Sequence, residues 1–168
     1  MEDNPVPNKS SSASIRIVRD SDSEAILAWR NNPDVRKWSR NQEILSKEEH
    51  EKWFGAWLRP NHQKGHFFII ENSFSTLGMV RFDSRSLHEY EISIVVDPNH
   101  QNRGVARKAI ALAAHEIILA EGNFSILATI NRENRLSISL FSKIGFIQTV
   151  FNEEFLQFRR EYTLQDFN

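Results

Sequence analysis

The amino-acid sequence predicts a single mixed α/β (α+β) domain, with a largely antiparallel central sheet of about seven strands flanked by helices. Alternating apolar residues or β-branched and aromatic enrichment mark seven candidate strands, at residues 14–19, 66–72, 76–83, 90–97, 124–130, 146–151 and 155–162. The second, third and fourth are separated by short gaps, which favours an antiparallel meander. No internal repeat or second zone of composition divides the 168 residues, a length typical of one domain.

Three helical segments are expected between the first and second strands. The first follows a capping residue at Asp20 or Ser21 and stops at the motif NNP, residues 31–33, after which a turn or two of helix is expected at 34–38. Ser46 and Glu49 have the spacing of a capping box, which predicts a helix over about 47–58.

Two further helices are expected in the second half of the chain. Residues 103–120 have one apolar face, formed by Val105, Ala109, Leu112, Ala113 and Ile117. A second helix is expected over 134–145, where Gly145 ends it.

Composition excludes several classes of site. A net charge of −1 gives no general basic surface for nucleic acid or an anionic membrane, so any basic site must be local. The absence of cysteine removes disulfides, thiolate nucleophiles and cysteine-bound zinc. His62 and His66 are four residues apart, but Lys64 and Gly65 argue against a helix there, so no metal site is expected.

The first 13 residues, MEDNPVPNKSSSA, are polar and lack the apolar stretch of a signal peptide. We expect them to form a disordered tail in front of one domain at 14–168. No apolar run approaches the roughly 20 residues of a membrane span. The expected protein is therefore cytoplasmic, with no membrane or nucleic-acid partner, and is a monomer or a homodimer.

The segment VVDPNHQNRGVARKAIALAAHE, residues 95–116, has an unusual charge pattern. The predicted helix opens with Arg103, Arg107 and Lys108, although a helix N-terminus carries partial positive charge and favours acidic side chains. Small residues at Gly104 and Ala106 let a ligand approach the backbone closely. Free N–H groups at a helix start bind phosphates, so the segment predicts a diphosphate site. The alternative is an ordinary strand–helix turn with solvated arginines, since both common glycine-rich nucleotide motifs are absent.

This segment resembles the acetyl-CoA pyrophosphate loop of the GNAT N-acetyltransferase superfamily, whose pattern is Gln/Arg-x-x-Gly-x-Gly/Ala after a strand that ends V-x-P. The matching residues are Val96, Pro98, Gln101, Gly104 and Ala106. About thirty residues later, NRENRLSISLFSKIGF resembles the second signature of the superfamily, with Asn134, Ser137, Phe141, Gly145 and Phe146 in its places. The order of predicted elements is also similar over residues 14–163.

The resemblance implies a GNAT-like fold and an N-acetyltransferase that uses acetyl-CoA as co-substrate and needs no metal. It implies that backbone groups of Ile94, Val95 and Val96 hold the thioester and pantetheine arm. The implied pyrophosphate site is the turn and helix start formed by Gln101, Asn102, Arg103, Gly104, Val105, Ala106 and Arg107. Asn134 would bind the pantetheine arm, cap a helix, or do both, and Ser137 and Phe141 would lie beside the cofactor.

Acetyl transfer to an amine requires a group that removes a proton from nitrogen and a donor that polarises the thioester carbonyl. Glu91, on the strand that leads to the thioester, is the candidate base, and Glu89 on the same face is a second candidate. An exposed strand carboxylate is the alternative for Glu91. Many GNAT enzymes have tyrosine at the position of Phe141 and use it to protonate the leaving thiolate. Phenylalanine has no proton to donate, so another group or water must do so.

The segments AWRNNPDVRKWS and SKEEHEKWF resemble a subgroup that acetylates 4-amino sugars of nucleotide sugars, as in pseudaminic acid biosynthesis, and relatives that acetylate ribosomal proteins. The resemblance implies that Trp29, Arg30 and His50, with Arg36 and Trp53, frame the acceptor groove. A guanidinium suits a diphosphate and aromatic rings suit a base or sugar, so the expected partner is a nucleotide sugar. Core packing is the alternative for the tryptophans, while His50 could be a base, a substrate ligand or a surface residue of the capping turn. The alternative functions are acetylation of a protein N-terminus or lysine, and acyl-CoA binding without turnover.

Overall fold

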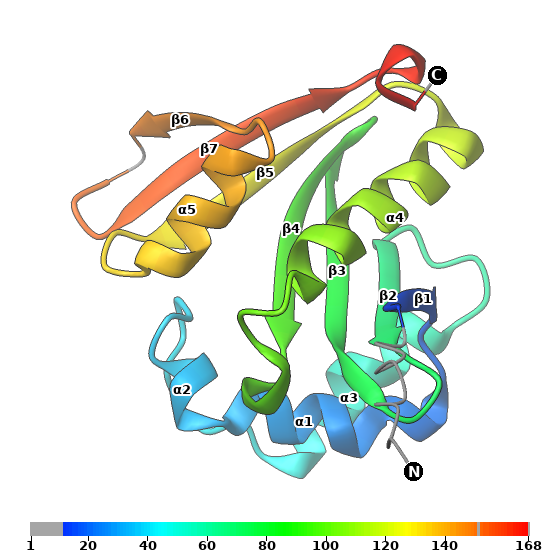
Figure 1. Cartoon of the computed structure of the whole chain (residues 1–168). Helices are drawn as coiled ribbons and strands as arrows, with labels where there is room; N and C mark the ends of the chain where they lie inside the picture. The colour runs from blue at the N-terminus through cyan, green and yellow to red at the C-terminus, as the bar shows by residue number, and fades with distance from the viewer. Residues whose placement is uncertain (1–11, 151, 168) are drawn as a thin grey trace, which may run out of the picture.

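The structure, a computed structural model that describes residues 12–150 and 152–167, contains one seven-stranded sheet in the order β1-β2-β3-β4-β5-β7-β6 (Figure 1). Its strands are β1 (Ser14–Ile17), β2 (Gly65–Glu71), β3 (Thr76–Ser86), β4 (Glu89–Val96), β5 (Phe124–Asn131), β6 (Ile147–Val150) and β7 (Phe155–Tyr162). The predicted tail up to residue 11, and residue 151 of the predicted sixth strand, lie outside these ranges.

The predicted fold class is confirmed. Every neighbouring pair of strands is antiparallel except β4 and β5, which are parallel. The long helix between these two strands carries the chain back to the end of the sheet where β4 begins, so β5 runs in the same direction as β4. β6 and β7 form the expected hairpin, and β7 is the strand of that hairpin that pairs with β5.

The helices are α1 (Ser23–Asn31), α2 (Pro33–Arg36), α3 (Lys47–Leu58), α4 (Val105–Glu121) and α5 (Arg135–Lys143). The predicted capping box is confirmed, since Ser46 Oγ accepts from the N–H of Glu49 and the Glu49 carboxylate accepts from the N–H of Ser46. The motif NNP ends α1 and also starts α2, because Asn32 caps the new helix and Pro33 takes its first position.

Two helix starts differ from the sequence prediction. A 3-10 turn at Asp20–Asp22 precedes α1, so neither Asp20 nor Ser21 is its N-cap, and the Asp22 carboxylate binds Arg16 instead. α4 begins at Val105 rather than at residue 103, because Gly104 has a φ of 74°, which a helical residue cannot adopt. None of the helices within the described ranges is long and apolar enough to cross a membrane.

Helices cover the sheet on both faces. One hydrophobic core lies between α4, α5 and one face of the sheet, and includes Val80, Ile92, Ile117, Ile126 and Phe158. A smaller core lies on the opposite face, between α1, α3 and strands β2 to β4. Because side chains alternate along a strand, even-numbered residues of β4 face α4 and odd-numbered residues face α1 and α3.

The feature that positions the site is the divergence of β4 from β5. The two strands pair only from Glu89 opposite Ser125 to Glu91 opposite Leu127. Beyond Glu91, β4 continues for five more residues beside β3 but without β5. The sheet is therefore split at this point, and the two strands separate in the ribbon view (Figure 1).

Candidate functional site

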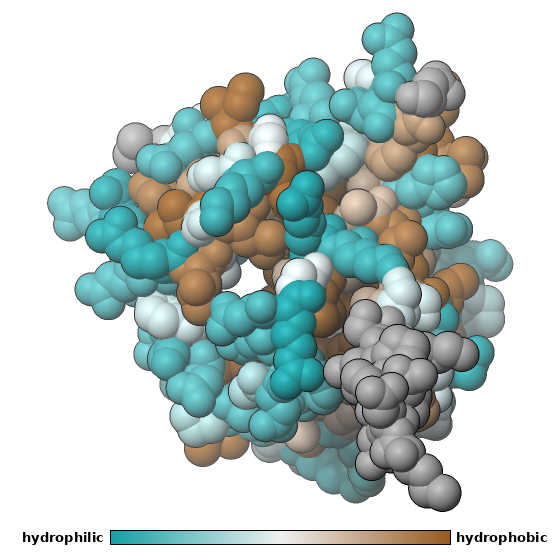
Figure 2. All heavy atoms as spheres, viewed as in Figure 1, coloured by the Kyte–Doolittle hydropathy of each residue, from teal (hydrophilic) through white to brown (hydrophobic). Residues whose placement is uncertain are grey.

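The split between β4 and β5 opens into a cleft of about 980 Å³. Its walls are the free half of β4, the facing half of β5, the start of α4, one side of α5, and the loop between α2 and α3. Figure 2 shows an opening between the upper part of the molecule, which contains α5, and the lower part, which contains α2. The volume is at the upper end of the range typical of small-molecule and cofactor sites.

The free edge of β4 offers backbone groups to this cleft. The N–H of Ser125 donates to the carbonyl of His88, and the N–H of Asp97 donates to the carbonyl of Leu77 on the other side of β4. Hydrogen-bonding direction alternates along a strand, so even-numbered residues of β4 point toward β5 and odd-numbered residues toward β3. The N–H and carbonyl of Ile94 and the N–H of Val96 are thus directed into the gap, whereas Val95 is paired with β3.

The start of α4 forms one end of the cleft. Gly104 caps the helix with its φ of 74°, and apart from Gly104 and its chain neighbours no heavy atom of the described residues lies within 4 Å of the place where a Cβ would stand. The first N–H groups of the helix, from Val105 to Arg107, have no partner within the helix and carry its positive end charge. The preceding turn is braced by Gln101, whose Nε2 donates to the carbonyl of Val96 at 3.1 Å.

Nearly all of the predicted pyrophosphate-site residues line the cleft. They are Gln101, Asn102, Gly104, Val105, Ala106 and Arg107, whereas the side chain of Arg103 is exposed outside it. Arg107 therefore supplies a cation beside the helix start. The free space at Gly104, the unpaired amides and this cation fit a diphosphate.

The third wall is α5. The Oδ1 of Asn134 accepts from the N–H of Ser137 at 3.1 Å, so Asn134 is the helix N-cap, while it also lines the cleft. Ser137 lines the cleft one turn later. Phe141 also contributes to the lining, and its ring is otherwise buried, packing edge-on against Phe146 with centroids 4.9 Å apart.

The two candidate bases have different surroundings. Glu91 is the last residue of β4 that is paired with β5, so its carboxylate lies at the point of divergence and lines the cleft. Its Oε1 accepts from Arg40 and its Oε2 from Arg85. Glu89 does not line the cleft and binds Arg159 at 2.6 Å. Position therefore favours Glu91 over Glu89.

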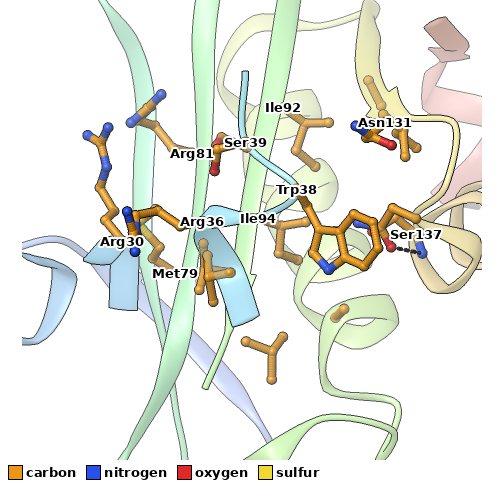
Figure 3. Close-up of a pocket in the computed structure, with 18 of the residues that line it drawn as sticks. Arg30, Arg36, Trp38, Ser39, Met79, Arg81, Ile92, Ile94, Asn131 and Ser137 are labelled. Atoms are coloured by element: carbon orange, nitrogen blue, oxygen red, sulfur yellow. Dashed lines mark hydrogen bonds between the residues drawn. The ribbon is translucent and has the colours of Figure 1, made fainter. Parts of the chain in front are cut away.

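The end of the cleft nearest α1 and β3 is rich in arginine. Arg30, Arg36 and Arg81 lie on the same side of it, opposite Asn131 and Ser137 (Figure 3). The guanidinium carbons of Arg30 and Arg81 lie 4.9 and 5.0 Å from the centre of the Trp53 ring. Arg81 is bound by Asp83 through both carboxylate oxygens. Burial, followed by repulsion from Arg81, lowers the pKa of Arg30 from its ordinary value.

Trp29 and His50 do not line the cleft, contrary to the sequence prediction. The indole N–H of Trp29 donates to Asp97 at 3.0 Å, which ties α1 to the turn after β4. His50 is 1% exposed, stacks on Phe54, and bonds Ser23 Oγ through Nε2 at 3.1 Å. Burial lowers the pKa of His50 and thus favours the neutral form of the ring. The structure gives both side chains a place in the packing of α1 and α3.

Several cleft residues escaped the sequence analysis. Arg81 stands on the predicted strand 76–83, Arg85 stands on the part of β3 beyond that range, and Trp38 and Arg40 follow α2 in a loop. Figure 3 shows the Trp38 indole in the cleft between Ile94 and Ser137. A polar residue at every second position of residues 81–85 was the available signal, since it marks one face of the strand. Within the described ranges, no three His, Cys, Asp or Glu side chains are grouped to hold a metal ion.

Comparison with known proteins gives one family. A family model described as an acetyltransferase (GNAT) domain matches residues 14–147. The chain is 27% identical over 139 residues to the uncharacterized protein MJ1062 of Methanocaldococcus jannaschii, covering 80% of this chain and 28% of that protein. The chain thus spans less than a third of the length of this curated relative.

Solved structures share the fold. A domain from Methanocaldococcus jannaschii DSM 2661 superposes with a TM-score of 0.77 at 24% identity, over 90% of this chain and 99% of that one. A spermidine N-acetyltransferase from Vibrio cholerae, in complex with CoA and spermine, gives a TM-score of 0.76 at 19% identity, over 89% and 95% of the two chains. Since the family model covers most of the sequence and the fold agrees, the chain belongs to the acetyltransferase (GNAT) domain family.

Proposed function

We propose that this acetyltransferase domain transfers the acetyl group of acetyl-CoA to the primary amine of a 4-amino sugar carried on a nucleotide. The observation that carries the acceptor class is the surplus of arginine at one end of the cleft. Five arginines gather there, namely Arg30, Arg36, Arg40, Arg81 and Arg85. Asp83 binds Arg81 and Glu91 binds Arg40 and Arg85, so among the described residues Arg30 and Arg36 have no carboxylate partner.

The cleft as a whole is also cationic. Its lining contains seven Arg and Lys side chains and five Asp and Glu side chains. Two of those carboxylates are used locally, since Asp34 binds Lys37 at 2.8 Å and Glu49 closes the capping box of α3. Arg36 adds a buried Nε that has no hydrogen-bond partner among the described residues. A buried donor of this kind favours an anionic ligand.

The same surplus opposes a polyamine acceptor. The Vibrio cholerae structure holds spermine, a polycation. A polycation in the cleft of this chain would place ammonium groups beside Arg30 and Arg81, whose charges already repel each other. A nucleotide diphosphate would instead neutralise these guanidiniums, and aromatic side chains such as Trp38 suit its base or sugar.

The cofactor half of the cleft supports acetyl-CoA as co-substrate. The α4 start and Arg107 would take the pyrophosphate, and the free edge of β4 at Ile94 and Val96 would hold the pantetheine arm. The N–H of Ile94, directed into the gap, is the donor available to polarise the thioester carbonyl.

The reaction begins with an acceptor that arrives as an ammonium ion. Glu91, directly or through water, takes one proton from it, and the neutral nitrogen attacks the thioester carbon to form the C–N bond. The C–S bond then breaks, and the sulfur leaves with the bonding electrons. The nitrogen releases its second proton to solvent, and water protonates the thiolate. Phe141 donates no proton in any of these steps.

The test is acceptor competition. The purified chain is assayed for thiol release from acetyl-CoA with UDP-linked 4-amino sugars, with spermidine, and with a basic peptide that has a free N-terminus. Turnover with the sugars is expected. Turnover with the peptide or spermidine and with no sugar isomer would contradict the acceptor class, and CoA binding without turnover would identify a non-catalytic domain.

A variant tests the arginine end directly. Arg30→Met should raise the KM for the nucleotide sugar roughly 10- to 100-fold, because a charge-assisted contact contributes about 1.5–3 kcal/mol. The KM for acetyl-CoA should be almost unchanged. Arg59, an exposed residue after α3 that does not line the cleft, gives the matched control Arg59→Met. A thermal melt of both variants separates lost affinity from lost stability.

A further inference from the structure

The loop between α2 and α3, residues 37–46 and here called the acceptor loop, forms one wall of the cleft. Eight of its residues line the cleft, namely Lys37, Trp38, Ser39, Arg40, Asn41, Glu43, Ile44 and Leu45. Its end is fixed to α1, because the side-chain amide of Asn31 exchanges two hydrogen bonds with the backbone of Leu45, at 2.8 and 2.9 Å.

The middle of the loop is held to the sheet at a single point. Among the described residues, a single ion pair joins the acceptor loop to the sheet, and no other hydrogen bond or ion pair does so. It links Arg40 to Oε1 of Glu91. Arg40 is half exposed, whereas the Glu91 side chain is only 14% exposed. The remaining hydrogen bonds and ion pairs of the loop are internal or run to α1, α2 and α3, as in the bond from Arg36 to the carbonyl of Gln42 and the capping box of Ser46 with Glu49.

The second oxygen of Glu91 is held differently. Oε2 accepts from Arg85, which stands on β3 where the register with β4 shifts between Ser84 and Ser86. In a bulge of this kind the additional residue, here Arg85, points its side chain in a new direction, while the bulged strand remains part of the sheet. Glu91 is thus bound by one guanidinium on a strand and by another on a loop.

Each oxygen of the Glu91 carboxylate therefore already accepts a hydrogen bond from a guanidinium, and an acceptor ammonium that reaches Glu91 must compete with one of them. We propose that Arg40 is a latch: it holds the acceptor loop closed over the cleft through Glu91, and the ammonium group of the acceptor replaces it on Oε1. Arg85 stays on Oε2 and keeps the carboxylate oriented. Arg40 is therefore a positioning residue, and the exchange rests on the proposed function, whereas the closure of the loop does not.

The other charges around Glu91 are already committed. Asp83, opposite Glu91 on β3, binds Arg81, and Glu89, two residues back on β4, binds Arg159 of β7. The residue opposite Glu91 on β5 is the uncharged Leu127. Arg40 and Arg85 are the cations in contact with the Glu91 carboxylate among the described residues.

The first test needs no acceptor. Trp38 belongs to the acceptor loop, so its emission, isolated as the difference between each protein and its Trp38→Phe variant, reports loop position. At low salt, Arg40→Met and Glu91→Gln should show a red-shifted Trp38 emission. The Trp38 emission of Arg85→Met should match that of the natural sequence, because this variant leaves the Arg40–Glu91 pair intact. As added salt screens the pair, the Trp38 emission of the natural sequence should shift toward that of Arg40→Met. Identical emission from Arg40→Met and the natural sequence would overturn the latch.

The second test uses the nucleotide-sugar acceptor. Because an exposed ion pair contributes about 0.2–1 kcal/mol, Arg40→Met should lower the acceptor KM up to roughly fivefold, while Arg85→Met should not lower it. The acidic limb of the pH profile gives the sharper readout, since kcat/KM reports the free enzyme and kcat the enzyme–substrate complex. Arg40→Met should move this limb to higher pH in kcat/KM alone. Arg85→Met should move it in both.

If Arg40→Met moves the acidic limbs of the kcat/KM and kcat profiles equally, Arg40 stays on Glu91 in the complex. That result would overturn the proposed exchange of Arg40 for the acceptor ammonium. If no amine acceptor is turned over, the proposed function and the exchange both fail, while the emission of Trp38 still decides whether the loop is latched. Circular dichroism of each variant excludes unfolding as the cause.

Discussion

Gly104 is the residue on which the proposed pyrophosphate site depends most directly. Its positive φ and the open space around it mean that a side chain there would enter the region in front of the α4 amides. Gly104→Glu should weaken acetyl-CoA binding at least tenfold in calorimetry, since it adds both bulk and negative charge at the proposed diphosphate position. Gly122→Glu is a control for backbone strain, because Gly122 also has a positive φ, of 80°, has open space at its Cβ position, and ends the same helix. Equal loss in both variants would attribute the effect to backbone strain.

Phe141 stands where the resemblance to the superfamily implies a tyrosine that acts as an acid. Its ring is 3% exposed, and it reaches the cleft beside α5. Phe141→Tyr should leave kcat similar or raise it, because the added hydroxyl can protonate the thiolate. A rise from no detectable activity would identify the natural chain as an acyl-CoA-binding domain without turnover. A fall in melting temperature alone would indicate only that a hydroxyl had been buried without a partner.

At the scale of elements, α1 and α3 illustrate what sequence can predict. Their positions follow from local signals, such as the Ser46–Glu49 box and the Asn32–Pro33 start. Which face of each helix meets the cleft is decided by packing against the distant β2 and β3. Trp29 and His50 therefore match a motif and yet point into the core, while Arg30, next to Trp29, lines the cleft.

His50 joins α3 to Ser23 of α1, and this contact leads to a prediction about the pH dependence of stability. Burial lowers its pKa in the folded protein, so the unfolded chain binds a proton first as pH falls below about 6.5. Its contribution to stability is complete above that pH and decreases as pH falls toward the folded-state value. His50→Leu should flatten the stability profile in this window in denaturant titrations. The KM values for both substrates should stay unchanged, and a raised acceptor KM would restore His50 to the acceptor site.

The whole molecule shows why the site was only partly predictable. The cofactor motifs lie in two short segments whose pattern can be matched residue by residue. The acceptor end is assembled from α1, the acceptor loop, β3 and β4. The contact between Arg40 and Glu91, for example, spans 51 positions in the sequence. No local pattern marks such a pair, so the contact between Arg40 and Glu91 emerges only when the fold brings the two residues together.

The split sheet leads to a prediction about the molecule as a whole. β4 and β5 are joined by only three residue pairs, so the two halves of the sheet meet over a short length beside an open cleft. A ligand that pairs with the free edge of β4 would bridge these halves. Binding of acetyl-CoA at 100 times its Kd should stabilise the fold by about 2.7 kcal/mol, with a corresponding rise in Tm.

Amide hydrogen exchange would locate that bridge along β4. The N–H groups of Ile94 and Val96 are directed into the gap, whereas those of Ser93 and Val95 are directed toward β3. In the free protein, Ser93 and Val95 should therefore exchange slowly, and Ile94 and Val96 more rapidly. Acetyl-CoA should slow Ile94 and Val96 with little change at Ser93 and Val95, because only the former pair can donate to the pantetheine arm. Uniform slowing along β4 would indicate general stabilisation without contact, and unchanged Ile94 and Val96 amides in a saturated complex would exclude this edge as the cofactor site.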